Sequence, residues 1–180
     1  MHINFGNRKF FNHYGININA LQKAINHVYM FDIKKPIFIK FINRLKNFAG
    51  KHSFRYYSDK HCKFMSEAFK QAIKDTNVLN NSKKVGTHFH QVTMGGTKIF
   101  GNVFDNYTQK KFFHTLAHEI QHAIQYDNQK NFKLTYQFSD YSMFNDLYYH
   151  TPIEADAEYG AMMNTMYLMN AYFKFLDKEI

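Results

Sequence analysis

The residues best suited to metal chemistry form one short run, His118-Glu119-Ile120-Gln121-His122, which has the pattern HExxH. Two histidines four residues apart on a helix lie about 40° apart around its axis and roughly 6 Å apart, so both imidazoles can reach one zinc ion. Glu119 lies about a quarter turn away, where its carboxylate can meet a water on the open side of the metal. The run therefore predicts a zinc ion bound by His118 and His122, with Glu119 as general base.

Chance and context both favour a metal site over a helix face that is merely rich in histidine. Random placement of the 11 histidines and the glutamates of this chain gives the pattern about 0.02 times, so coincidence is a poor explanation. The surrounding sequence TLAHEIQHAIQ also has a continuous apolar stripe, which predicts that the back of the helix is buried and that the ligands are held rigidly. His114, one turn earlier, is the residue that supports the competing interpretation.

A zinc ion held by two histidines needs a third protein ligand. The segment PIEADAE begins 30 residues after His122 and offers three carboxylates at the start of a predicted helix. Glu154 and Glu158 share one face of that helix, whereas Asp156 points away from it. We expect Glu154 to be the ligand, and Glu158 to accept a hydrogen bond from the free N–H of a ligating histidine.

A capping role competes for the same carboxylate. Thr151-Pro152-Ile153-Glu154 fits a capping box, in which the Glu154 carboxylate accepts a hydrogen bond from the main-chain N–H of Thr151. If Glu154 caps the helix, Glu158 or Asp156 becomes the metal ligand.

The elements that position these residues follow from the periodicity of the apolar residues. Helical spacing predicts five helices, at residues 19–29, 36–48, about 59–73, about 108–126 and about 151–176. Alternation after residue 84, together with the pair Gly95-Gly96, predicts a hairpin of strands 92–94 and 97–100 in a short antiparallel sheet. Residues 128–150 show no clear period. The methionines of AMMNTMYLMN are expected in the core.

Length and charge suggest one domain with two unlike parts. The chain has 180 residues, of which 45% are hydrophobic, and only two prolines, which fits a single domain over residues 1–180. Residues 1–90 carry 16 Lys and Arg against 4 Asp and Glu, whereas residues 91–180 carry 7 against 10. We therefore distinguish a basic helical part, residues 1–80, from a metal-binding core, residues 81–180. The basic part would attract nucleic acid or an acidic protein, although a solvated lysine-rich surface is the simpler interpretation.

The single cysteine, Cys62, excludes an intramolecular disulfide framework and a zinc site built from cysteines. The first residues, MHINFGNRKFF, lack the apolar stretch of a secretory signal, and no later stretch is apolar enough to predict a membrane span. We expect a cytoplasmic protein, with specialised export left open.

HExxH on one helix, followed by a glutamate near the start of a later helix, resembles the gluzincin branch of the zincin metallopeptidases. The run Glu154-Ala155-Asp156-Ala157-Glu158 is similar to that of small bacterial and phage zincins. The resemblance covers about residues 85–176. It implies an α+β, zincin-like fold, in which a short antiparallel or mixed sheet packs on the HExxH helix and on a C-terminal helix that bears the third ligand. The edge strand of the sheet would pair with an extended peptide substrate.

The metzincin branch is disfavoured, because Gln125 and Asn128 stand where its pattern HExxHxxGxxH requires glycine and histidine.

The resemblance implies a zinc-dependent metallopeptidase, an endopeptidase rather than an exopeptidase, with one Zn²⁺ per chain bound by His118, His122 and Glu154. The metal would lower the pKa of a water, Glu119 would take its proton as general base, and a peptide bond of a protein or peptide substrate would be hydrolysed. Tyr148 is expected to support the oxyanion that forms.

Three alternatives stay open at this point. Tyr149 or His150 could replace Tyr148, and aromatic packing against the last helix is a competing role for all three residues. His88 and His90 share one face of a predicted strand, where they could bind a second metal, line the cleft or lie half exposed. The chain could also be a basic, nucleic-acid-associated binding module in which the zinc site is structural.

Overall fold

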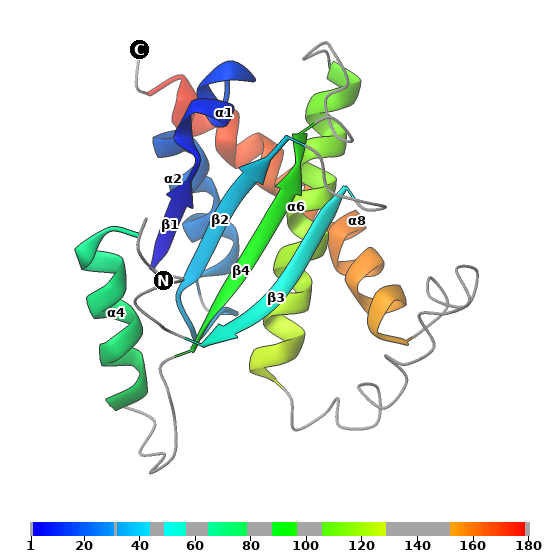
Figure 1. The fold of residues 1–180 in the computed structure, drawn as a ribbon. Coiled ribbons are helices and arrows are strands. Elements are labelled where there is room, and N and C mark those ends of the chain that lie inside the picture. The colour runs from blue at the N-terminus through cyan, green and yellow to red at the C-terminus, as the bar shows by residue number, and fades with distance from the viewer. Residues whose placement is uncertain are drawn as a thin grey trace.

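The structure is a computed structural model that describes residues 2–30, 32–43, 49–56, 65–78, 88–96, 106–128 and 152–178. Within these residues one four-stranded sheet is flanked by helices, so the expected α+β class is confirmed (Figure 1). The strands are β1 (Ile3–Gly6), β2 (Ile37–Ile42), β3 (Gly50–Tyr56) and β4 (His88–Gly95). The helices are α1 (Arg8–His13), α2 (Ile18–Tyr29), α4 (Glu67–Val78), α6 (Asn106–Asp127) and α8 (Pro152–Leu176).

The sheet is mixed, with the strand order β1-β2-β4-β3. β1, β2 and β4 are parallel, whereas β3 runs antiparallel to β4, so that Gly50 pairs with Met94 and His52 with Val92. This order places β3 at one edge of the sheet, and β3 is the edge strand that contacts α6.

Helices cover the two faces of the sheet unequally (Figure 1). The face that carries Ile39 and Val92 packs on α2, α6 and α8 in the main hydrophobic core. The opposite face carries Phe38 and Phe89, which form a small second cluster with Phe69 of α4. The HExxH helix is therefore buried between the sheet and α8, as a rigid support for metal ligands requires.

Three helices lie close to where the sequence predicted them. α2 begins after Asn17, whose side chain accepts a hydrogen bond from the main-chain N–H of Ala20 at 3.0 Å and so caps the helix. α6 covers the predicted range 108–126, and its apolar residues Phe112, Leu116 and Ile120 are buried. α8 has Pro152 in its first turn, where the missing N–H costs nothing, and ends at Leu176 as expected.

The predicted helix at 36–48 is wrong in the part that the structure describes. The run IFIKFI forms β2, which pairs with β1 on one side and β4 on the other, and five of its six residues are apolar. A short apolar run of this kind fits a buried strand as well as a buried helix, and its β-branched and aromatic residues favour the strand.

Three other predictions also need correction. α4 begins at Glu67, later than the predicted start near residue 59, although residues 57–64 lie outside the described part. β4 has β2 and β3 along its two sides, so it is not one arm of a hairpin with residues 97–100, which themselves are not described. Strands from residues 3–56 join a strand from residues 88–95 in one sheet, so the part over residues 1–80 that was expected to be helical contains three strands as well as helices.

Three of the four methionines of α8 that were expected in the core lie on an exposed face. Met162, Met163 and Met166 are 67%, 52% and 49% exposed, and Tyr159 and Tyr167 extend the same face. Met169 is partly buried and packs against the main core. The other face of α8 packs on α6 and α2 through small residues such as Ala157 and Ala161. Among the described helices, none combines the length and apolar character needed to cross a membrane.

Candidate metal centre

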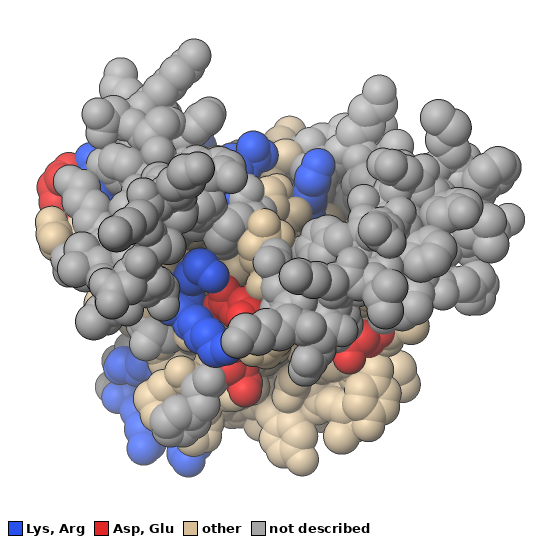
Figure 2. Space-filling view, turned by 90° about the horizontal axis from the view of Figure 1, so that it is seen from below, with Lys and Arg blue, Asp and Glu red and all other residues tan. Residues whose placement is uncertain are grey.

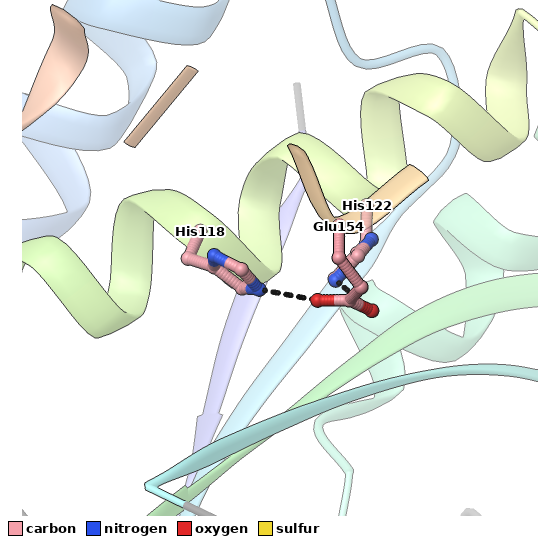
Figure 3. A group of neighbouring side chains, drawn as sticks. All are labelled: His118, His122 and Glu154. Carbon is pink, nitrogen blue, oxygen red and sulfur yellow. Dashed lines mark hydrogen bonds and ion pairs between the residues drawn. The ribbon is translucent and has the colours of Figure 1, made fainter. Parts of the chain in front are cut away.

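Three side chains from two helices meet beside the sheet (Figure 3). His118 and His122 extend from α6, and Glu154 extends from the first turn of α8. The Glu154 carboxylate is buried, with Oε2 lying 3.2 Å from His118 Nε2 and Oε1 lying 3.4 Å from His122 Nε2. One ligand atom from each residue lies within 4.8 Å of the other two, so this group could hold a metal ion.

The donor set is one that zinc uses. Zinc binds histidine nitrogen and carboxylate oxygen at roughly 2.0–2.2 Å, and two histidines with one glutamate form the ligand set of several catalytic zinc sites. His118 Nε2 faces Glu154 Oε2 and His122 Nε2 faces Glu154 Oε1, so each imidazole directs one nitrogen at the carboxylate. The residues present could therefore hold one metal ion between them.

The position of Glu154 favours the ligand role over the capping role. Each of its two carboxylate oxygens is within 3.4 Å of an imidazole nitrogen from α6. Thr151, the other partner in the proposed capping box, lies outside the described residues.

Gln125 orients His122, a role that the sequence did not reveal. His122 Nδ1 lies 2.8 Å from Gln125 Oε1. The Gln125 amide nitrogen donates to Ile153 O at 2.8 Å and to Asp156 Oδ2 at 2.7 Å, which fixes the amide so that its oxygen faces His122. His122 Nδ1 must then carry the proton, which leaves the Nε2 lone pair for a metal. Gln125 stands where the metzincin pattern requires glycine. Here its side chain is buried and contacts His122.

The two other acidic residues of α8 have different surroundings. Glu158 Oε2 lies 3.3 Å from His118 Nδ1, and its Oε1 lies 3.1 Å from His114 Nε2. Glu158 is therefore placed, as expected, to accept a hydrogen bond from the nitrogen of His118 that does not face Glu154. Asp156 Oδ2 accepts hydrogen bonds from the side-chain amides of Gln121 and Gln125. In this arrangement Glu154, rather than Asp156 or Glu158, faces both histidines.

Glu119 lies beside the metal group and contacts β3. Its side chain is buried, and it accepts a hydrogen bond from the main-chain N–H of His52. Burial raises the pKa of the Glu119 carboxyl above its usual value, and His122 and His118 oppose this shift only in part. A carboxylate with a raised pKa is better able to accept and return a proton near neutral pH.

Gly50 makes room for this carboxylate. A Cβ atom at Gly50 would lie 2.6 Å from Glu119 Oε1 and 2.7 Å from Thr115 Cγ2, closer than real Cβ atoms approach their neighbours. Only a glycine lets the edge strand come this near to α6. The sequence contained no signal that Gly50 belongs to the site, because the two elements are brought together only by folding.

No other described strand pairs with the outer edge of β3, and this edge lies next to Glu119. The hydrogen bond from Gly95 N to Ala49 O fixes which pairs along β3 and β4 are hydrogen bonded, and residues 50, 52 and 54 fall in the alternate pairs. In an antiparallel pair the main-chain groups of these alternate residues point away from the partner strand. The His52 N–H that reaches Glu119 therefore belongs to the open edge of the sheet.

The charges of the group depend on one another. Burial by itself lowers the pKa of His122, but the hydrogen bond and the negative charge of Glu154 outweigh it, so the pKa of His122 is raised. The metal-free group thus favours holding a proton between His122 and Glu154. A metal ion that takes the same position must displace that proton, so its affinity should rise with pH.

The remaining predicted site residues fall into two classes. Tyr148, Tyr149 and His150 lie outside the described residues, and so does the side chain of His88. His90 is fully buried, so it is neither half exposed nor part of a cleft. It contacts Asp127 and His52 in the interior, at a distance from the metal group that keeps it out of the ligand set.

The chain was compared with known proteins by family, by curated sequence and by solved structure. None of the three comparisons gives a match. The function must therefore be inferred from the residues and the geometry of this site.

Proposed function

We propose that this chain is a zinc-dependent metallopeptidase of gluzincin type. The observation that carries the proposal is the meeting of His118, His122 and Glu154 around one point, with the buried carboxylate of Glu119 beside them. Bound zinc supplies Lewis acidity, which polarises a carbonyl group and lowers the pKa of a water.

The chain's own residues would perform the proton transfers. Glu119 takes the proton of the attacking water, holds it on its carboxylate and returns it to the leaving amine. The raised pKa of Glu119 supports this double role. Gln125 and Glu158 keep the imidazoles of His122 and His118 in the orientation that a metal requires. Tyr148 remains the residue proposed to support the oxyanion.

The outer edge of β3, which no other described strand covers, supports a peptide as substrate. The main-chain groups of residues 50 and 54 and the carbonyl of His52 point outward beside Glu119, and an extended peptide can pair with such an edge. Pairing would place a backbone carbonyl, rather than a side chain, near the metal. We therefore propose cleavage within a protein or peptide chain.

The number of ligands favours a catalytic over a structural zinc ion. Structural zinc sites are usually closed by four protein ligands, whereas catalytic sites have three and leave a position for water. Among the described residues, the group contains three donor residues. The side chains of His118 and His122 keep 19% and 14% of their surface exposed, so water can reach them.

A nucleic-acid-binding module with a structural zinc is the alternative that the net charge of +9 suggests. On the face drawn in Figure 2, however, the described Lys and Arg side chains lie in several separate groups, some of them beside acidic side chains, and do not form one uniform basic patch. Salt-dependent binding of DNA or RNA, unchanged by Glu119→Gln, would favour this alternative.

The test combines metal content with hydrolysis of an unfolded protein. The wild-type chain should hold one zinc ion and cleave the substrate, and Glu119→Gln should hold zinc but not cleave. Glu154→Ala should lose zinc, whereas Glu158→Ala, the matched control on the same helix, should retain it with weaker affinity. A wild-type protein without stoichiometric zinc, or a Glu119→Gln variant with full activity, would refute the proposal.

A further inference from the structure

A second set of polar side chains lies in the interior beside the metal centre and centres on Asp127, the last residue of α6. The Asp127 side chain is fully buried. Its Oδ2 accepts hydrogen bonds from the main-chain N–H groups of Lys34 at 2.8 Å and Lys35 at 3.2 Å. Its Oδ1 lies 2.9 Å from Lys35 Nζ and 3.1 Å from His90 Nε2. Asp127 thus joins the end of α6 to the segment before β2 and to β4.

His90 connects Asp127 to β3. His90 Nδ1 lies 3.0 Å from His52 Nε2, so exactly one of the two nitrogens donates a hydrogen bond to the other. We assign a proton to His90 Nε2, because this nitrogen lies 3.1 Å from a carboxylate oxygen of Asp127 that can only accept. In a neutral His90 the Nδ1 atom is then the acceptor, and His52 must carry its proton on Nε2.

His52 is in contact with the metal centre through both its ring and its main chain. Its ring centroid lies 6.3 Å from that of His122 and 6.2 Å from that of Tyr126. Its main-chain N–H donates to Glu119. The contacts from Asp127 through His90 and His52 therefore end at Glu119, which lies on the same helix. Glu119 is eight residues before Asp127, or about 12 Å away along the helix axis.

We propose that Asp127, His90 and His52 form a positioning relay that fixes β3 against α6, and so holds Glu119 and His122 in place for the reaction. The proposal rests on the proposed function for its effect on catalysis. None of the three residues belongs to the metal-ligand group, and His52 contacts Glu119 only through its main-chain N–H. They act by fixing the tautomer and ring of His52, and through His52 the main-chain N–H that binds Glu119.

In a connected series of hydrogen bonds, unlike in a simple core contact, a change at one residue alters the next residue. Each histidine is held by the proton position of the next group, so a change at Asp127 or His90 must reach His52 even though no atom of His52 is altered. Removal of one partner also leaves a buried polar group without its hydrogen bond, which shifts β3 until another partner is found. Glu119 moves with β3, because its main-chain donor lies on that strand.

The experiment uses the full chain loaded with Co²⁺ or Zn²⁺ and compares His90→Gln with Phe69→Leu. Phe69 lies in the cluster on the opposite face of the sheet, so its substitution lowers stability without touching the relay. We expect His90→Gln to keep one metal ion per chain and to change the ¹⁵N signals that report the tautomer of His52, as well as the visible spectrum of bound Co²⁺. Its kcat should fall at least tenfold with KM within about twofold, and Phe69→Leu should change none of these.

Asp127→Asn is the second variant if His90→Gln does not fold. Its side-chain oxygen can still accept from Lys34 and Lys35, but its amide would then face His90 Nε2 as a donor, which should invert the tautomers of His90 and His52. Unchanged ¹⁵N signals of His52 and an unchanged Co²⁺ spectrum in either variant would overturn the relay. If the wild-type chain binds metal but cleaves no peptide, the proposed function fails, while these two spectroscopic readouts still decide the relay.

Discussion

The close contact between Gly50 and α6 gives the sharpest test of how Glu119 is positioned. In Gly50→Ala the new Cβ would lie 2.6 Å from Glu119 Oε1, 2.7 Å from Glu119 Cγ and 2.7 Å from Thr115 Cγ2. Carbon atoms prefer separations of about 3.5–4.0 Å, so β3 or Glu119 must move by about 1 Å. Both neighbouring side chains are buried on a packed helix and cannot turn into solvent. Overpacking of this kind costs about 1–3 kcal/mol in the free energy of unfolding.

The same displacement should reduce hydrolysis much more than it reduces metal binding. A misplacement of about 1 Å in a reacting group can lower the rate about 100-fold. The three atoms nearest to the new Cβ belong to Glu119 and Thr115 and not to the ligands His118, His122 and Glu154, so zinc content should stay at one per chain. Urea unfolding, zinc content and initial rates of peptide cleavage measure the three quantities.

Gly6→Ala is the matched control. Its Cβ would lie 2.5 Å from Phe38 Cζ, a comparable overlap, but on the face of the sheet opposite the metal group. Both variants should lose stability, and only Gly50→Ala should lose activity per folded molecule. Equal activity losses in the two variants, or wild-type activity in Gly50→Ala, would refute the argument that Gly50 positions Glu119.

Three further predictions concern the surroundings of the site and α8. Gln125→Leu should weaken zinc binding about 10- to 100-fold, because the N–H of His122 loses its acceptor; competition with a coloured chelator measures this, and an unchanged affinity would contradict it. Burial lowers the pKa of His52 to about 2, so below pH 6.5 the unfolded chain binds a proton that the folded chain does not, and this group should cost about 2 kcal/mol of stability between pH 7 and pH 5. The raised pKa of His122 acts in the opposite direction, so the measurement is the difference in metal-free stability between wild type and His52→Gln, which should shrink as the pH falls. Ala161→Leu should destabilise the fold by about 1–3 kcal/mol, whereas Met162→Glu, one residue later but 67% exposed, should change it by less than about 0.5 kcal/mol in thermal unfolding.

Local patterns in the chain predicted the helices that carry the site. The periodicity of α6 and α8 extends over many turns, and the spacing of His118 and His122 depends only on helix geometry. The pairing of Glu154 and Glu158 on one face of α8 is equally local. Such features can be read from residues that are close in sequence, which is why these elements agree with the structure.

Short apolar runs were ambiguous. IFIKFI fits a helix by its spacing, and it becomes β2 because strands on both sides can pair with it. Met162, Met163 and Met166 of α8 look like core residues, and they are exposed because the opposite face of the helix meets α6 and α2. In both cases the neighbours, which come from distant parts of the chain, decide the outcome.

The sequence by itself determined that two imidazoles and the Glu119 carboxylate share one helix, because a helix fixes the relation of residues four positions apart. Only the tertiary structure decided that β3 is the edge strand, that Gly50 admits Glu119, and that Gln125 and His52 hold the site from behind. These contacts join residues up to about 70 positions apart. The apolar pattern of a strand or helix does not indicate which distant element will pack against that strand or helix.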